Sequence, residues 1–162
     1  MKRKWYIAWA LTILFGTLLH DLYDWFPNPL TALISPVNES VWEHMKLLFW
    51  PYLAAAWILV QQESDPWQAW SGHLLSLLVM PLSLLGVYYT LDGGLEISAL
   101  WIDLLLYVLA MAEGFALACH AGRGKGLKPL APVLLLLVCL YAVLLTLFTF
   151  AAPALPLFLP AG

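Results

Sequence analysis

Histidines and carboxylates recur at helical spacing in this chain. His20 and Asp24 are four residues apart, as are Ser40 and His44, so each pair would share one face of a helix. Asp103 lies about two turns into a later apolar segment. Mixed imidazole and carboxylate ligands suit Zn²⁺ best in this setting, with Mn²⁺ or Fe²⁺ next. The predicted ligands of a divalent metal are His20, Asp24, His44 and Asp103.

A second set of polar residues follows the same helical track. Glu39, Glu43 and Lys46 have i, i+4 and i+7 spacing, so they would lie on one face of a helix. Glu43 or Glu39 would act as general base, and Lys46 or Ser40 would stabilise a developing oxyanion. Structural roles fit the same residues, because Lys46 could pair with a nearby acid. Asn38 and Glu39 could also serve only to cap a helix.

A thinner polar layer is expected nearer the other membrane face. Glu113 follows Asp103 by ten residues, which is roughly 15 Å along a helix. His73 lies near the start of its own apolar segment and could approach Glu113. A Glu113–His73 pair would extend a polar route across the bilayer, whereas a histidine at the membrane interface would not.

The composition places these residues in a membrane protein. The 162-residue chain is 63% hydrophobic and 10% charged, whereas soluble domains average about 45–50% and about 25%. A soluble protein of this size could not bury so much apolar surface. The net charge of -3 provides no basic surface for nucleic acid. Cys119 and Cys139 form neither a metal-ligand pair nor a disulfide framework.

Hydropathy predicts an all-α membrane bundle of about five transmembrane helices in a single domain, 1–162. The expected spans are 5–25, 39–61, 67–89, 97–118 and 131–152. The first two apolar runs are short, so their polar ends must partly enter the membrane. Prolines interrupt the chain at 27–36, and this apolar connection either lies at the surface or re-enters the membrane.

Basic residues indicate how the bundle is oriented. Six of the seven lie before the first span or between the fourth and fifth, at Lys2, Arg3, Lys4, Arg123, Lys125 and Lys128. Such clusters stay on the cytoplasmic side of a membrane. The N-terminus is therefore expected in the cytoplasm, with the predicted metal ligands near the outer face.

The stretch from Ser35 to Leu47 reads Ser-Pro-Val-Asn-Glu-Ser-Val-Trp-Glu-His-Met-Lys-Leu. It resembles the signature of an uncharacterised family of small, multi-spanning bacterial membrane proteins. Gly16, and Leu19-His20 with Tyr23, resemble the first span of that family. The resemblance implies a multi-pass protein of the bacterial cytoplasmic membrane, and it implies no activity.

A second resemblance concerns intramembrane zinc hydrolases, which include alkaline ceramidases and adiponectin receptors. Those proteins place a serine four residues before a zinc-binding histidine, as Ser40 and His44 stand here. They also carry a later His-x-x-x-His pair in a seven-helix bundle, which this sequence lacks. The likeness implies a zinc role for His44 without implying a shared fold.

Three classes of function fit these observations. The first is an intramembrane metal-dependent hydrolase or transferase, which acts on a lipid or lipid-linked substrate near the outer leaflet. The second is a cation- or proton-coupled transporter or channel, favoured by acids at two membrane depths. The third is a noncatalytic membrane partner or assembly protein. Expected partners are membrane lipids, a lipid or small-molecule substrate and, as a further option, other copies of the chain.

Overall fold

The computed structural model describes residues 3–159, without the side chain of Lys125. Lys2, one of the basic residues used above, lies outside this range. The described residues form seven α-helices and no strand, which confirms an all-α protein. The helices are α1 (Arg3–His20), α2 (Leu22–Trp25), α3 (Pro29–Ile34), α4 (Val41–Val60), α5 (Pro66–Tyr89), α6 (Leu100–Ala121) and α7 (Ala131–Phe150). Shorter helical turns are η1 (Thr90–Gly94), η2 (Lys125–Leu130) and η3 (Pro156–Phe158).

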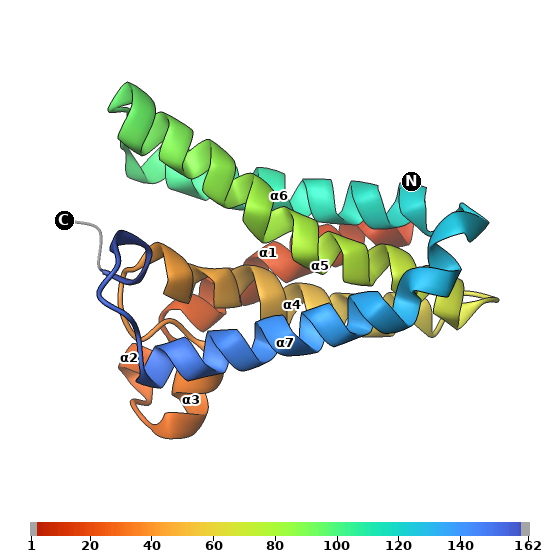
Figure 1. Ribbon diagram of the computed structural model, residues 1–162, viewed down its shortest axis with the longest axis horizontal. Helices are drawn as coiled ribbons and strands as arrows, with labels where there is room; N and C mark the ends of the chain where they lie inside the picture. The colour runs from red at the N-terminus through yellow and green to blue at the C-terminus, as the bar shows by residue number, and fades with distance from the viewer. Residues whose placement is uncertain (1–2, 160–162) are drawn as a thin grey trace.

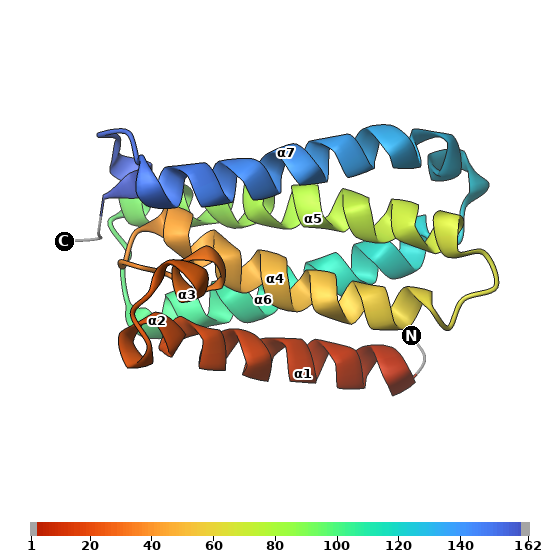
Figure 2. The same cartoon turned by 90° about the horizontal axis from the view of Figure 1, so that it is seen from below.

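The five long helices run roughly along one axis of the molecule (Figure 1). α1 and α7 lie on opposite sides of the bundle, with α4, α5 and α6 between them (Figure 2). The short helices α2 and α3 lie at the same end as the α5–α6 connection and the end of α7. This end also holds His20, at the end of α1, and the first turn of α4, which carry predicted metal ligands. We call it the cluster end.

Three helical segments are long and apolar enough to cross a membrane, which indicates a membrane protein. They are Pro66–Gly94, Leu100–Ala121 and Gly126–Phe150. They correspond to the third, fourth and fifth predicted spans. α1 and α4 run beside them in the bundle but carry charged residues in their first turns. Three candidate spans are therefore found among the described residues, and the count of five spans stays a prediction.

The first predicted span, 5–25, is shorter in the structure because α1 stops at His20. The Ser35 hydroxyl donates to the carbonyl oxygen of Leu19 at 2.6 Å, and the Tyr23 amide donates to the same hydroxyl at 3.0 Å. These bonds hold the end of α1 against the end of α3 and satisfy a carbonyl that the helix leaves free. The chain therefore turns at Asp21 before it enters α2.

The connection 27–36 contains a helix of its own. Asn28 caps α3 by accepting from the Leu30 and Thr31 amides, and Thr31 accepts in return from the Asn28 amide. Pro29 occupies the first helical position, where its missing N–H costs nothing. The 27–36 segment is thus an ordered helical hairpin with α2.

The second predicted span begins two residues late. Asn38 was expected at the helix start, but its side chain accepts from the Ser40 amide at 2.9 Å and forms a turn. Ser40 is the N-cap instead, and its hydroxyl accepts from the Glu43 amide at 3.3 Å. α4 therefore begins at Val41, and Glu39 lies in the loop just before it.

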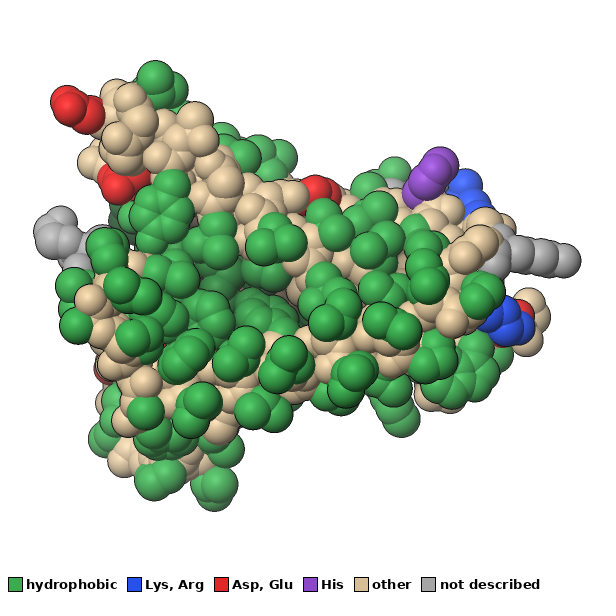
Figure 3. Space-filling view, viewed as in Figure 1, with side chains coloured by type: hydrophobic (Ala, Val, Ile, Leu, Met, Phe, Trp, Pro, Cys, Tyr) green, Lys and Arg blue, Asp and Glu red, His purple; other side chains and the backbone are tan. Residues whose placement is uncertain are grey.

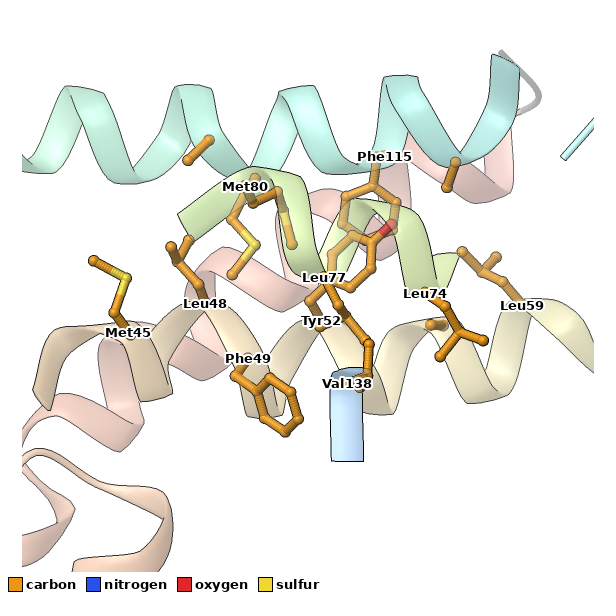
Figure 4. Packing of buried hydrophobic residues seen from close by; sticks show 14 of the residues in the cluster. Met45, Leu48, Phe49, Tyr52, Leu59, Leu74, Leu77, Met80, Phe115 and Val138 are labelled. Atoms are coloured by element: carbon orange, nitrogen blue, oxygen red, sulfur yellow. The ribbon is translucent and has the colours of Figure 1, made fainter. Parts of the chain in front are cut away.

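A buried apolar core fills the middle of the bundle (Figure 4). Tyr52 of α4, Leu77 and Met80 of α5 and Phe115 of α6 are almost fully buried in it. At the cluster end the α5–α6 hairpin leans away from α4 and α7 (Figure 1). The core therefore fills the middle of the molecule.

Candidate metal centre

Three potential metal ligands meet at the cluster end: His20, Glu39 and His44. The two Nε2 atoms lie 3.2 Å apart. Glu39 Oε2 lies 3.4 Å from His44 Nε2 and 3.8 Å from His20 Nε2. Both imidazoles are partly buried, and Glu39 is exposed. We call these three residues the metal cluster.

The Nδ1 atoms of both histidines are already occupied. His44 Nδ1 lies 2.8 Å from the carbonyl oxygen of Ser40, which can only accept, so this nitrogen donates. His20 Nδ1 lies 3.0 Å from Asp21 Oδ1 and donates to that carboxylate. Hydrogen bonds of this kind orient metal-binding histidines and direct the other ring nitrogen to the metal. In their neutral forms, His20 and His44 therefore face each other with two Nε2 lone pairs.

The spacing of the three ligand atoms fits a small cation. Two lone pairs at 3.2 Å repel unless a proton or a metal ion lies between them. Zinc binds nitrogen at about 2.0–2.1 Å, so two tetrahedral ligands lie about 3.3 Å from each other. The observed separations of 3.2, 3.4 and 3.8 Å lie near this value. The residues therefore suit Zn²⁺ with only small side-chain movements.

The metal cluster lines one end of a cavity of about 620 Å³ between α1, α4, α5 and α6. Leucines supply much of the wall: Leu47, Leu48, Leu84, Leu100, Leu104 and Leu106. Figure 3 shows hydrophobic side chains around a hollow beside the splayed α5–α6 hairpin. The cavity is within the usual size range of ligand pockets, about 300–1,000 Å³.

The other two predicted ligands lie outside the metal cluster. Asp24 is exposed on α2, because the turn at Asp21 breaks the helical register that would have aligned it with His20. Asp103 lines the same cavity from α6. Within residues 3–159, its carboxylate has no hydrogen-bond or ion-pair partner among the described side chains. Asp103 is exposed, so its carboxylate is accessible from the cavity.

Glu43 and Lys46, the expected base and oxyanion donor, are sealed away from the cavity. Their side chains are 3% and 0% exposed, and their charged groups pair at 2.6 Å. Lys46 also donates to the carbonyl oxygens of Ala32 at 2.7 Å and Ser35 at 3.2 Å. The ammonium therefore has three acceptors for its three protons. Neither side chain reaches the metal cluster.

Further contacts of Glu43 tie the cluster end together. Its Oε2 accepts from the Val37 amide at 2.9 Å, and its Oε1 lies 3.0 Å from the Thr149 hydroxyl of α7. The Ser40 hydroxyl is likewise buried as the cap of α4. Glu43, Lys46 and Ser40 thus hold together the segments that carry the metal cluster.

The thinner polar layer divides into two separate contacts. His73 is 2% exposed, its Nδ1 lies 3.1 Å from the Tyr52 hydroxyl, and its ring stacks on Trp5. Glu113 accepts from the Ser83 hydroxyl at 2.9 Å instead. The expected Glu113–His73 pair is absent from the described residues, because Tyr52 takes the place of Glu113 beside the imidazole.

The model of a family of unknown function, DUF6512, matches residues 1–161. This chain belongs to that family. The prediction that the chain belongs to an uncharacterised family is thereby confirmed, and the match covers residues 1–161. No curated protein and no protein of solved structure matches the DUF6512 chain.

Two contributors to this DUF6512 site carried only weak sequence signals. Asp21 was not among the predicted ligands, yet its carboxylate accepts from His20 Nδ1 and orients that ring. Its position directly after a histidine was the available signal. Glu39 was expected as a base or a cap, yet it stands at ligand distance from both imidazoles. Placing it required the turn that Asn38 makes before the helix.

Proposed function

We propose that this protein is an intramembrane metal-dependent hydrolase or transferase whose metal is held by His20, Glu39 and His44. The supporting observation is the convergence of three ligand atoms at tetrahedral spacing, with both Nδ1 atoms engaged elsewhere. Two histidines and one glutamate form a known catalytic zinc ligand set, which leaves the fourth position to water. Zn²⁺ is the preferred metal, with Mn²⁺ or Fe²⁺ next.

The bound metal would lower the pKa of a water molecule and supply hydroxide. With an ester substrate, the hydroxide oxygen bonds to the carbonyl carbon. The bond from that carbon to the leaving oxygen then breaks, and the leaving oxygen takes a proton. In a transferase, an alcohol oxygen replaces the water oxygen. The protein must therefore supply a group that moves this proton.

Asp103 is the residue we assign to proton transfer. It lines the same cavity as the metal cluster and is free of protein partners among the described side chains. The buried Glu43 carboxylate, by contrast, accepts from Lys46 and from the Val37 amide. Asp103 therefore takes the acid–base role that the sequence pattern had given to Glu43 or Glu39.

The proposed substrate is a lipid or a lipid-linked molecule in the outer leaflet. Lys4 at the start of α1, and Arg123 and Lys128 in the α6–α7 connection, lie at the end of the bundle opposite the metal cluster, as expected for a cytoplasmic face. With α1 and α4 counted as spans, the chain crosses the membrane five times and the N-terminus is inside. The metal cluster then lies at headgroup level on the outer side of the bacterial membrane.

The arrangement of polar groups favours this proposal over transport. A carrier or channel for cations needs polar groups along its whole route. Here the metal cluster lies at one end of the bundle, whereas the His73–Tyr52 contact is buried in the apolar core beside Phe115. The cavity at the cluster end is suited to holding a substrate rather than to conducting one.

Elemental analysis of the detergent-purified protein tests the proposal. We expect close to one transition-metal ion per chain, and at least a tenfold loss of retained metal in His44→Ala and Glu39→Ala. His120→Ala is the matched control, because His120 is exposed on α6 at the opposite end. Wild-type protein that contains no metal, and takes up none when Zn²⁺ is added, would overturn the proposal.

A further inference from the structure

The cavity next to the metal cluster is open to the side of the bundle. Its α5 and α6 walls continue into side chains that the bundle leaves exposed, such as Leu100 and Leu104 at 75% and 55% exposure. Both belong to a segment long and apolar enough to span a membrane. The hollow in Figure 3 lies where the α5–α6 hairpin leans away. Bilayer hydrocarbon therefore has access to the cavity from the side.

Water is a poor occupant for most of this volume. Apolar cavities without polar partners stay dry, and leucines form most of the wall away from the metal cluster. The polar residues of the lining are Thr17, His20, Asp21, Glu39, His44 and Asp103, and three of them form the metal cluster. An occupant must therefore have an apolar part and a polar linkage at one end.

We infer, on the basis of the proposed function, that the cavity takes an acyl chain of a bilayer lipid. The chain enters sideways between α4 and the α5–α6 hairpin. Its ester or phosphoester linkage lies between the metal cluster and Asp103, where the polar groups are. The substrate class is then a lipid that stays in its own leaflet while it reacts.

The inner end of the cavity limits how much of the lipid it holds. Tyr107 packs against Gly16, where even a methyl group would overlap its hydroxyl, and lies 3.5 Å from the carbonyl oxygen of Leu47. On α4 the cavity extends from Val41 to Leu48, which is about 10 Å of helix. The cavity therefore holds the linkage and the first part of the chain, and the remainder stays in the bilayer.

Photo-crosslinking in vesicles tests this inference. The vesicles contain phosphatidylethanolamine and phosphatidylglycerol, with a trace of phosphatidylethanolamine that carries a diazirine near the carboxyl end of one acyl chain. Labelling of Leu104 is compared with labelling of Leu136, which is 68% exposed on α7 and away from the cavity. We expect Leu84→Trp to fill the cavity and to reduce the Leu104-to-Leu136 ratio at least threefold.

A control on the same helix separates filling of the cavity from the presence of a tryptophan. Leu82 is 69% exposed and does not line the cavity, so Leu82→Trp should leave the ratio unchanged. If Leu84→Trp does not fold, Leu104→Trp replaces it, with Tyr88 as the labelled position. An equal ratio in the wild type and in the filled variant would overturn the inference, because the lipid would then contact Leu104 only from outside.

Metal analysis of the same samples separates this inference from the proposed function. If the protein holds stoichiometric metal but Leu84→Trp has no effect, the proposed metal site stands and the inference about the acyl chain is wrong. If the protein holds no metal but Leu84→Trp gives the threefold effect, the inference about the lipid-binding cavity stands and the proposed metal-dependent activity is wrong. His44→Ala should lose metal and keep the labelling ratio, since it removes a ligand and leaves the leucine walls in place.

Discussion

At the scale of single residues, the buried ion pair of Glu43 and Lys46 holds together the segments around the metal cluster. The pair connects the end of α3, the first turns of α4 and the last turn of α7. Removing charges from water is costly, so such a pair stabilises a protein only when its hydrogen bonds are complete. Here the ammonium has three acceptors, and both carboxylate oxygens have a neighbour that can donate. Replacement of one partner should therefore destabilise the whole cluster end.

We predict that Lys46→Met destabilises the protein by about 3–5 kcal/mol, because it leaves Glu43 buried without a counter-charge. The double variant Lys46→Met with Glu43→Leu should recover part of this loss, since it removes the unpaired charge as well. Unfolding of the purified protein in detergent, followed by circular dichroism, measures both. A double variant less stable than Lys46→Met alone would contradict this account of the pair.

A second residue-scale prediction concerns Asp65, the N-cap of α5, which lies outside the membrane-spanning segments. The hydrogen bond from Lys128 and then the bond from the Gln68 amide lower the pKa of Asp65 below its ordinary value of 3.8. A lowered pKa in the folded state adds stability above the unfolded pKa, and this stability is lost as the pH falls through the folded pKa.

Asp65→Asn should therefore flatten the fall in thermal stability below about pH 4, while it keeps a side-chain oxygen for the cap. Asp65→Ala should lower stability at neutral pH as well, because the cap is lost too. Melting temperatures measured across the acid range test both variants. An unchanged acid slope in Asp65→Asn would mean that other carboxylates control this range.

At the scale of helices, the α5–α6 hairpin depends on a close approach of two backbones. A methyl group on Gly72 of α5 would lie 2.8 Å from the Ala118 carbonyl oxygen and 2.9 Å from the Gly122 amide nitrogen, both main-chain atoms. A methyl group on Gly114 of α6 would meet mainly the flexible side chain of Met80. The same substitution at the two glycines therefore has different consequences.

We predict that Gly72→Ala destabilises the protein by about 1–3 kcal/mol, because the helices must move apart. Gly114→Ala should cost less, since Met80 can change its rotamer. Both replacements raise helix propensity equally, so the difference between them isolates the packing. The pair can be compared by unfolding in detergent. Greater damage from Gly114→Ala would show that Met80 is held more rigidly than its chemistry suggests.

At the scale of the whole molecule, the two ends of the bundle differ in charge. Lys4 forms an ion pair with Glu63 at 2.7 Å, which joins the start of α1 to the α4–α5 turn. The α6–α7 loop with Lys128 lies at this same end, while Asp92 and Glu96 lie at the cluster end. This separation of charge is the basis for the proposed orientation.

Labelling of single cysteines from one side of the membrane tests five spans against three. In a Cys119→Ser, Cys139→Ser background, Asp24→Cys and Gly93→Cys should react with an impermeant maleimide in intact cells. Gln62→Cys and Gly126→Cys should react only after the membrane is opened. All four residues are exposed, and the Cβ positions of the two glycines are in open space. Reaction of Asp24→Cys and Gln62→Cys from the same side would remove α4 as a span.

Much of the fold could be read from local properties of the sequence. Continuous apolar runs have to form helices in a membrane, since each backbone hydrogen bond must be made within the segment. For this reason, the bounds predicted for the third and fifth spans, 67–89 and 131–152, fall within two residues of α5 and α7. Helical spacing also predicted that Ser40 and His44 share one face, because that relation involves only neighbouring turns.

The composition of the metal cluster depended on the tertiary structure. His20 and His44 come from different helices, and the packing of α1 against α4 brings their Nε2 atoms together. The turn at Asp21 directs Asp24 away from His20. Glu43 is buried and pairs with Lys46, so it does not line the cavity. The sequence by itself determined which chemical groups were present and how each helix would expose them. Which groups meet, and which are sealed from solvent, was decided by packing between distant segments, because helical periodicity carries no information about the distance between helices.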